Sequence, residues 1–480
     1  MCLSKRVNRQ LLAVTFLWVG VGLLAQGMAQ VKEAAKIPNS IIVIFQSQTL
    51  PSDAAQHIFQ AGGKVVSSLD AVGVVVAAPN TVDGPTLIAN LTKDNAVLDV
   101  DYDRVFDLIA PTQMWTDDDV GGQTHVPHPL PTFSPALPAD FFYTSSPQEW
   151  AVKRVGAQGG GIPGGGSGAW DVTKGAGVTI AILDTGVNPV HPDITPNLIG
   201  NISEIASPSA CDDGSPNDQQ GHGTWTSSLA AGAFGPGTGL VVGVAPEAHI
   251  LNVKVLQRVP GSGPDLFTQC LNGGGSGAFS RVLKGMVDAT LAHVDVVSMS
   301  LGGFVPRNLP KGQGAAIFSA FNRVANFANS NGVIVVAAAG NSALDLSKIN
   351  PLVELPAGAS NVIAVMATTN PNFPPPFCTG GTDCLASYSD FGVNLHGLSA
   401  PGGDVPAGGC AFSGTPCNPT GFVRGACSAG VPGTDFGLPA PGFSMGCFGF
   451  NFVGAGNHIW YVQATGTSAS GDPGPDFSSS

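Results

Sequence analysis

The second half of the chain alternates short apolar runs with segments of helical length, and this alternation constrains the fold more than any other feature. The first run, residues 178–183, is unbroken and rich in β-branched residues, which is typical of a strand buried on both faces of a parallel sheet. It ends at a carboxylate, Asp184. Sites in open α/β sheets lie beyond the carboxyl ends of strands, so Asp184 is predicted to face the functional edge. The alternative is a residue that only caps a turn.

The same pattern continues toward the C-terminus. Further strands are predicted at 250–255, 294–298, 333–338 and 362–367, and helices at 223–231, 281–292 and 315–330. Strands separated by helices of this length favour a parallel sheet with helices on both faces. We therefore predict a three-layer α/β domain over residues 150–480.

Residues 30–109 predict a smaller α+β domain. The expected order is strand 41–45, helix 52–61, strand 72–78, helix 86–91 and a last strand from 96 to 105. A β-α-β-α-β order of this kind predicts helices packed on one sheet. Residues 110–149 are rich in proline and predict an exposed linker that a protease would cut easily.

The N-terminus has the three parts of a secretory signal peptide. Lys5, Arg6 and Arg9 precede an apolar run at 11–25, and small residues before and at Ala29 suit cleavage there. A membrane anchor is the alternative, but the run is short for a spanning helix. The sequence therefore predicts a signal peptide over 1–29, a secreted or periplasmic protein, and no membrane association after cleavage.

Charge and cysteine content narrow the class of protein further. The 480 residues carry a formal net charge of −13 with no cluster of Lys and Arg, which argues against a nucleic-acid partner. Eight cysteines remain beyond Cys2, and an even number in an exported chain favours disulfides. Cys378–Cys384 and Cys410–Cys417 are the candidate pairs, and zinc is disfavoured because no Cys-x-x-Cys spacing is present.

Three further polar residues stand where chemistry would need them. His222 lies between two glycines at the start of the helix 223–231, Asn341 follows the strand 333–338, and Ser468 follows Gly-Thr near the C-terminus. An imidazole suits a general base, an amide can donate to an oxyanion, and a serine at a helix start can act as a nucleophile. Each residue alone has an ordinary interpretation as a cap or turn residue.

Together these residues resemble a known family. Asp-Thr-Gly at 184–186, Gly-His-Gly-Thr at 221–224, Ala-Ala-Gly-Asn at 338–341 and Gly-Thr-Ser at 466–468 occur in the order of the subtilisin-like serine peptidases, the subtilases. The resemblance covers roughly residues 150–469. It implies a catalytic triad of Asp184, His222 and Ser468, with Asn341 as an oxyanion donor.

The resemblance also implies how substrate and inhibitor bind. Ser300, Leu301 and Gly302 match the segment that pairs with the substrate backbone and borders the specificity pocket. Residues 40–107 are similar to the family's propeptide, an intramolecular chaperone and inhibitor. The chain is thus expected to be a monomeric, secreted serine endopeptidase that cleaves polypeptides through an acyl-enzyme and requires no cofactor.

A structural calcium is a further expectation, since the family often binds one. Asp212, Asp213 and Asp218 share one loop and could supply oxygen ligands. A solvated acidic loop is the alternative.

The end of the sequence departs from the family pattern. Subtilases continue from the serine into a long buried helix, whereas two prolines and two glycines follow within residues 471–475 here, which predicts no stable helix. We therefore expect a truncated chain that is poorly folded or inactive. The alternatives are an exported peptidase-fold protein that only binds and, much less favoured, a dinucleotide enzyme, because no Gly-x-Gly-x-x-Gly follows the first strand.

Overall fold

The computed structural model describes residues 31–110, 113–114, 139–145, 149–157, 167–370, 384–404, 421–428, 448–451 and 458–470. The chain separates into two compact units, Met1–Glu33 and Ala34–Ser480, and the elements named here belong to the second. The predicted signal peptide and the residues after Ser470 lie outside the described residues. Among the described helices, none combines the length and apolar character needed to cross a membrane.

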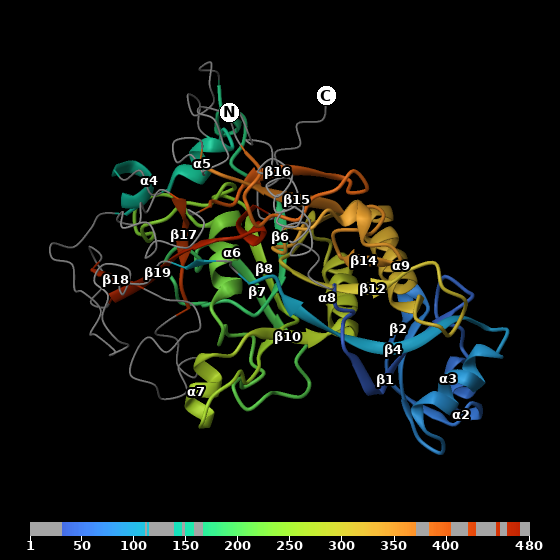
Figure 1. Ribbon diagram of the computed structural model, residues 1–480. Helices are drawn as coiled ribbons and strands as arrows, with labels where there is room; N and C mark the ends of the chain where they lie inside the picture. Colours follow the sequence, from blue (N-terminus) through green and yellow to red (C-terminus); the bar gives the residue numbers. More distant parts are fainter. Residues whose placement is uncertain are drawn as a thin grey trace, which may run out of the picture. The chain divides into compact units, whose positions relative to one another are not determined.

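A parallel sheet of seven strands forms the centre of the second unit (Figure 1). Its strands are β6 (Thr179–Asp184), β7 (Leu198–Ser203), β8 (His249–Lys254), β11 (Val296–Met299), β13 (Ile334–Ala338), β15 (Ile363–Thr368) and β16 (Gly397–Pro401). Their order is β16-β15-β13-β11-β6-β8-β7, with every neighbouring pair parallel. The predicted strands are all present, whereas the two edge strands β7 and β16 lack a continuous apolar run and were not predicted.

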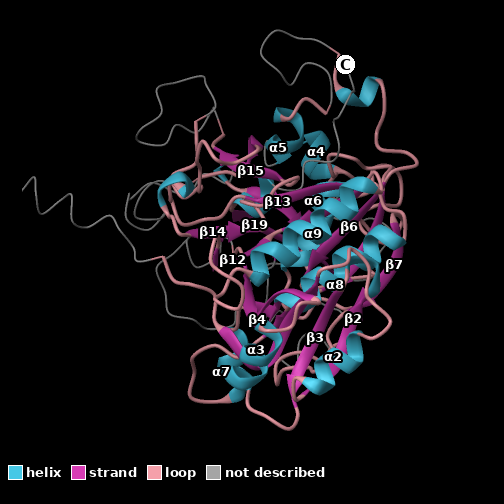
Figure 2. Ribbon diagram, turned by 90° about the vertical axis from the view of Figure 1, so that its right-hand side faces the viewer, coloured by secondary structure: helices cyan, strands magenta, loops and turns pink. Residues whose placement is uncertain are grey.

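Three helices cover the two faces of this sheet. They are α6 (His222–Ala231), α8 (Phe279–Leu291) and α9 (Ala316–Ser330). Successive residues of a strand point to opposite faces: Ala181 and Leu183 share a core with α8 and α9, while Ile180 and Ile182 share a core with α6. Figure 2 shows α8 and α9 side by side over the strands. The predicted three-layer α/β architecture is therefore confirmed.

The N-terminal part of the unit is an antiparallel sheet with two helices. Its elements are β1 (Lys36–Phe45), α2 (Ala54–Gln60), β2 (Gly63–Leu69), β3 (Val74–Pro79), α3 (Gly84–Thr92) and β4 (Val97–Leu108). Ile41 and Val43 pack on α2 and α3, while Ile42 and Ile44 join the core that contains α8 and α9. The predicted order omitted β2, because the residues between its two ends are exposed and do not form an apolar run.

The antiparallel sheet does not stop at β4 but continues into strands of the second half of the chain. They are β9 (Gln257–Arg258), β10 (Gly275–Ala278), β12 (Leu301–Pro306) and β14 (Leu352–Leu355). β4 pairs with both β10 and β12, and β12 pairs with β14. One long strand thus connects the N-terminal α+β part to the edge of the predicted site, while the proposed domain boundaries themselves stay a prediction.

The remaining elements are short. They are β5 (Gln113–Met114), α4 (Phe141–Ser145), α5 (Trp150–Arg154), α7 (Leu266–Leu271), β17 (Val423–Ala426), β18 (Phe448–Asn451), β19 (His458–Thr465) and α11 (Thr467–Ser470), with 3₁₀ turns at Asp70–Val72, Ala169–Asp171 and Leu346–Lys348. Strand β19 leads directly into α11, which carries Ser468.

Disulfides form in the described part of the chain. Cys211 bonds to Cys270 across 59 residues, a pair that the sequence did not suggest. Cys384 and Cys427 are also disulfide-bonded. The two suggested pairs involve Cys378, Cys410 and Cys417, which lie outside the described residues.

Candidate active site

Asp184 and His222 meet at the carboxyl edge of the parallel sheet. Asp184 ends β6 and His222 begins α6, and both are buried, at 1% and 0% exposure. His222 Nδ1 lies 2.9 Å from Asp184 Oδ2 and 3.0 Å from Oδ1. The Thr185 N–H donates to Oδ1 at 2.6 Å and the Thr226 hydroxyl to Oδ2 at 3.3 Å. Because both oxygens have partners, the carboxylate has a fixed orientation and can hold the imidazole in one tautomer.

Gly223, the residue after His222, allows α6 to approach the turn that follows β6. A Cβ on Gly223 would lie 2.1 Å from the Gly186 carbonyl oxygen, closer than any real contact. The Gly223 N–H also donates to Thr185 Oγ1 at 2.9 Å. The Asp-Thr-Gly and Gly-His-Gly-Thr motifs are therefore a single interlocked unit.

Asn341 is joined to the turn that carries Ser468. Its Oδ1 accepts the Thr467 N–H at 2.8 Å and the Thr467 hydroxyl at 2.9 Å. The Gly340 N–H in turn donates to Thr467 Oγ1 at 3.2 Å. The amide Nδ2 of Asn341 takes no part in these bonds and donates to the Ala110 carbonyl oxygen at 2.8 Å.

Ser468 is the second residue of α11 and is fully buried. Its hydroxyl donates to the Ile109 carbonyl at 2.8 Å. His222 Nε2, the ring nitrogen on the far side from Asp184, is buried without a hydrogen-bond partner. Helix α11 packs against α6, so the nucleophile candidate and the imidazole lie on adjoining helices.

The chain's own strand β4 fills the edge of the site. Its end pairs with β12, where Gly302 opposes Asp107 and Leu301 opposes Leu108, and with β10, where Gly277 opposes Phe106. The Ile109 N–H donates to the Ser300 carbonyl at 3.1 Å. The segment predicted to pair with a substrate backbone, Ser300 to Gly302, therefore pairs with the chain itself. Strand β10, the other side of this clamp, was missed because glycine, serine and alanine predict no strand.

The side chains of Ser468 and Asn341 are expected to act on the same carbonyl group. In this structure they contact the carbonyl oxygens of two consecutive residues. The Ser468 hydroxyl contacts that of Ile109, and the Asn341 amide contacts that of Ala110. An oxyanion hole needs its donors aimed at the oxygen of the attacked carbonyl. A small shift of the 109–110 segment would therefore precede attack on Ile109.

Two buried acids near Asn341 were not predicted. Glu354 lies on β14 with 6% exposure, and Asp390 has none. A Cβ on Gly340 would lie 2.2 Å from Asp390 Oδ2 and 2.7 Å from Glu354 Oε1, so both carboxyl groups reach the residue before Asn341. Burial, and then the neighbouring Asp390, raise the pKa of Glu354 well above its usual range, while burial raises the pKa of Asp390 to about 6. The only indication in the sequence was an acid inside the apolar run Leu352–Leu355.

The acidic loop suggested for calcium is occupied by donors of the chain. Asp212 accepts from Lys254 Nζ at 2.9 Å and from the Arg258 N–H at 3.0 Å. Asp218 accepts the Thr185 hydroxyl and the Gly221 N–H at 2.9 and 2.7 Å. Within the described ranges, no group of three or more His, Cys, Asp or Glu could hold a metal ion. Asp212 and Asp218 therefore already have donors from the chain, and calcium binding stays an untested expectation.

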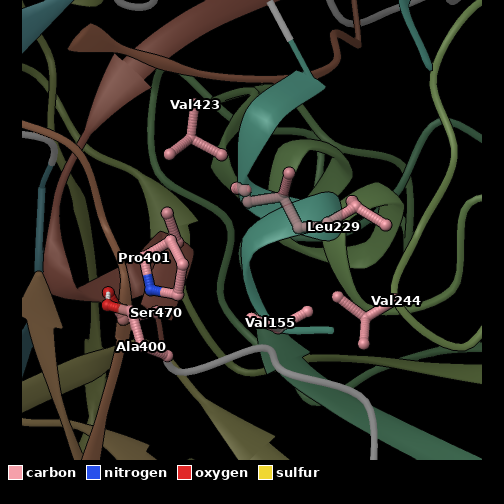
Figure 3. A pocket seen from close by; sticks show the side chains of 10 residues that line it. Val155, Leu229, Val244, Ala400, Pro401, Val423 and Ser470 are labelled. Carbon is pink, nitrogen blue, oxygen red and sulfur yellow. Dashed lines mark hydrogen bonds between the residues drawn. The ribbon is translucent and has the colours of Figure 1, made fainter. Parts of the chain in front are cut away.

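An apolar pocket lies beside α11, away from the residues above (Figure 3). Figure 3 shows Leu229, Val244, Ala400 and Val423 around it, with Ser470 at its edge. The Ser470 hydroxyl donates to the Ala400 carbonyl at 2.9 Å. None of the four motif residues lines this pocket, so it is separate from the candidate active site.

Comparison with known proteins agrees with the fold and with the motifs. The model of the subtilase family matches residues 175–436. Thermitase of Thermoactinomyces vulgaris is 33% identical over 234 residues, which cover 49% of this chain and 66% of thermitase. Subtilisin DY of Bacillus licheniformis is 34% identical over 233 residues, 48% of this chain and 67% of that protein.

A solved structure extends the likeness beyond the part of the chain that the sequence relatives match. The epidermin leader peptide processing serine protease of Staphylococcus aureus matches with a TM-score of 0.58 and 17% identity, over 91% of this chain and 85% of that one. At this identity the likeness shows the fold alone. The chain belongs to the subtilase family of serine peptidases. It spans less than two thirds of the length of several sequence relatives, and the family match ends before Ser468, so the role of that residue depends on its geometry.

Proposed function

We propose that this protein is a secreted serine endopeptidase that cleaves polypeptides through an acyl-enzyme. The observation that carries the proposal is a buried His–Asp pair beside the helix that carries Ser468, since α11 packs against α6. The Ser468 hydroxyl lies 2.8 Å from a peptide carbonyl oxygen. That carbonyl belongs to an extended segment held between two strands, as a substrate would be.

The roles of the residues follow from this geometry. Ser468 Oγ attacks the carbonyl carbon of the scissile bond while its proton passes to His222 Nε2. Asp184 orients the imidazole and stabilises its charged form. The proton then goes to the leaving amine, and an ester remains on Ser468. Water hydrolyses this ester with His222 again as the base, while Asn341 donates to the developing oxyanion.

The N-terminal α+β part acts as an intramolecular inhibitor in this proposal. Its last strand, β4, occupies the substrate edge, and Ile109 and Ala110 contact Ser468 and Asn341. A segment that is already folded in place loses little entropy on binding, which favours tight self-inhibition. Release of residues before 110 would then expose the site.

Secretion followed by activity measurements tests the proposal. The secreted protein should hydrolyse peptides and react with a fluorophosphonate probe, and Ser468→Ala should abolish both. A secreted protein that neither hydrolyses peptides nor reacts with the probe would instead bear out the sequence-based expectation of an inactive chain. If that protein is also folded and binds peptides, a binding protein of the same fold is supported.

A further inference from the structure

The side chain of Ile109 points toward the two buried acids beside Asn341. A Cβ on Gly302 would lie 3.4 Å from Ile109 Cδ1 and 3.4 Å from Glu354 Oε1. The tip of the isoleucine and the carboxyl oxygen thus both border the vacant side-chain position of this glycine. The space around the side chain of Ile109, whose carbonyl contacts Ser468, is therefore bordered by a carboxyl group.

This carboxyl group has no cationic partner. Glu354 and Asp390 hydrogen-bond to one another, which requires a proton on one of them, and no Lys, Arg or His in the described part of the chain pairs with either residue. Asp390 has a structural role as well, because its Oδ1 accepts the N–H groups of Ser342 and Leu344 at 3.0 and 2.6 Å. Glu354 has only its bond to Asp390. Two buried acids can both ionise only at a high cost unless a cation arrives.

A basic side chain in place of Ile109 would bring that cation. The ammonium group of lysine lies two bonds beyond the position of the isoleucine Cδ1, an added reach of about 2.5 Å by ordinary bond lengths. This reach carries the charge past Gly302 toward Glu354, and the longer arginine presents two donors to a carboxylate. An apolar side chain such as that of Ile109 leaves the two acids without a cation.

We propose that Glu354, supported by Asp390, makes this pocket select lysine or arginine at the residue whose carbonyl Ser468 attacks. The proposal rests on the proposed peptidase function and adds its substrate class. The chain's own Ile109 is then a poorly matched occupant, suited to an inhibitor that is cleaved slowly.

Peptide hydrolysis by the secreted protein tests the selectivity. The substrates are Phe-Asp-Leu-X aminomethylcoumarin peptides, which copy residues 106–108, with X as lysine, arginine, norleucine or glutamate. We expect kcat/KM for lysine to exceed that for its uncharged isostere norleucine by roughly 10²-fold, as for a buried charge pair. Glu354→Gln should reduce this ratio to near one, whereas Glu247→Gln, which removes an exposed carboxylate, should leave it unchanged. A ratio near one in the unaltered protein, or an equal loss on both substrates in Glu354→Gln, would overturn the proposal.

A second measurement needs no hydrolysis. In the full chain with Ser468→Ala, the melting temperature of Ile109→Lys is compared with that of Ile109→Met, with and without Glu354→Gln. We expect the lysine variant to melt about 2–4 °C higher than the methionine variant, the scale of one moderate interaction, and the difference to vanish with Glu354→Gln. An absent or reversed difference contradicts the pocket assignment. If no peptide is hydrolysed, the peptidase function fails, and this cycle still decides what the pocket accepts.

Discussion

Two buried carboxylate sites lie near Ser468, and they differ in how the chain satisfies them. Asp184 has partners on both oxygens, from Thr185, Thr226 and His222. Glu354 and Asp390 hydrogen-bond to one another and have no cationic partner in the described part of the chain. The first site is complete within the folded chain, as an orienting group must be. The second lacks a cation, and Glu354 borders the same glycine as the tip of the Ile109 side chain. The contrast separates a residue that arranges other residues from one that awaits a ligand.

Removing the charge of the completed site should have the largest effect. Asp184→Asn keeps the size of the side chain but presents an amide to His222, which favours the wrong tautomer. We expect kcat for peptide hydrolysis to fall by roughly 10⁴-fold, the scale known for this change in a serine peptidase triad, with the melting temperature nearly unchanged. A kcat within tenfold of the unaltered protein would show that Asp184 does not orient the imidazole.

The oxyanion donor should matter less than the triad. Asn341→Ala removes the Nδ2 donor, and we expect kcat to fall by roughly 10²–10³-fold with KM little changed, the scale for loss of one such donor in this family. Asn331→Ala, an exposed asparagine at the end of α9, is the matched control and should leave both constants unchanged. A large rise in KM at constant kcat would instead assign Asn341 to ground-state binding.

The incomplete site should reveal itself in the pH dependence of stability. The pKa of Asp390 is raised to about 6 from 3.8, so the folded state binds more protons than the unfolded state between these values. The free energy of unfolding therefore declines as pH rises from about 4 to 6. Burial and the neighbouring Asp390 raise the pKa of Glu354 as well, so Glu354→Gln removes one of the two groups that cause this decline, and the free energy of unfolding of the variant should decline less steeply with pH. Urea unfolding at several pH values measures the difference, and parallel curves would contradict the account.

Removing the charge of an exposed carboxylate should have the smallest effect. Asp288 pairs with Lys284 one helical turn away at 2.6 Å. Both side chains are more than a third exposed, Asp288 at 35% and Lys284 at 43%. Water and salt screen such a pair, so Asp288→Asn should change the free energy of unfolding by less than about 0.5 kcal/mol. A loss of more than about 2 kcal/mol in the free energy of unfolding of Asp288→Asn would contradict the claim that buried carboxylates matter more for stability than exposed ones in this protein.

The sequence predicted the five inner strands of the central sheet because they are mostly apolar runs such as 178–183, but not its edge strands β7 and β16. It did not predict β10, whose glycine and serine residues pair with the distant strand β4 and with β9, nor β2, whose exposed residues break the apolar pattern. The motifs around Asp184, His222 and Asn341 could be recognised because their glycines permit contacts that any Cβ would prevent. Glu354 could not be recognised, because nothing local shows that β14 directs it toward Gly340.

The central claim is that Ser468 is the nucleophile of a peptidase whose substrate edge is filled by residues before Ala110. The most direct measurement is the rate of peptide hydrolysis by the secreted protein, compared between the unaltered chain and Ser468→Ala. The account predicts hydrolysis that appears as the N-terminal part is released and that is lost in Ser468→Ala. Hydrolysis that persists in Ser468→Ala, or none after the N-terminal part has been released, would contradict it.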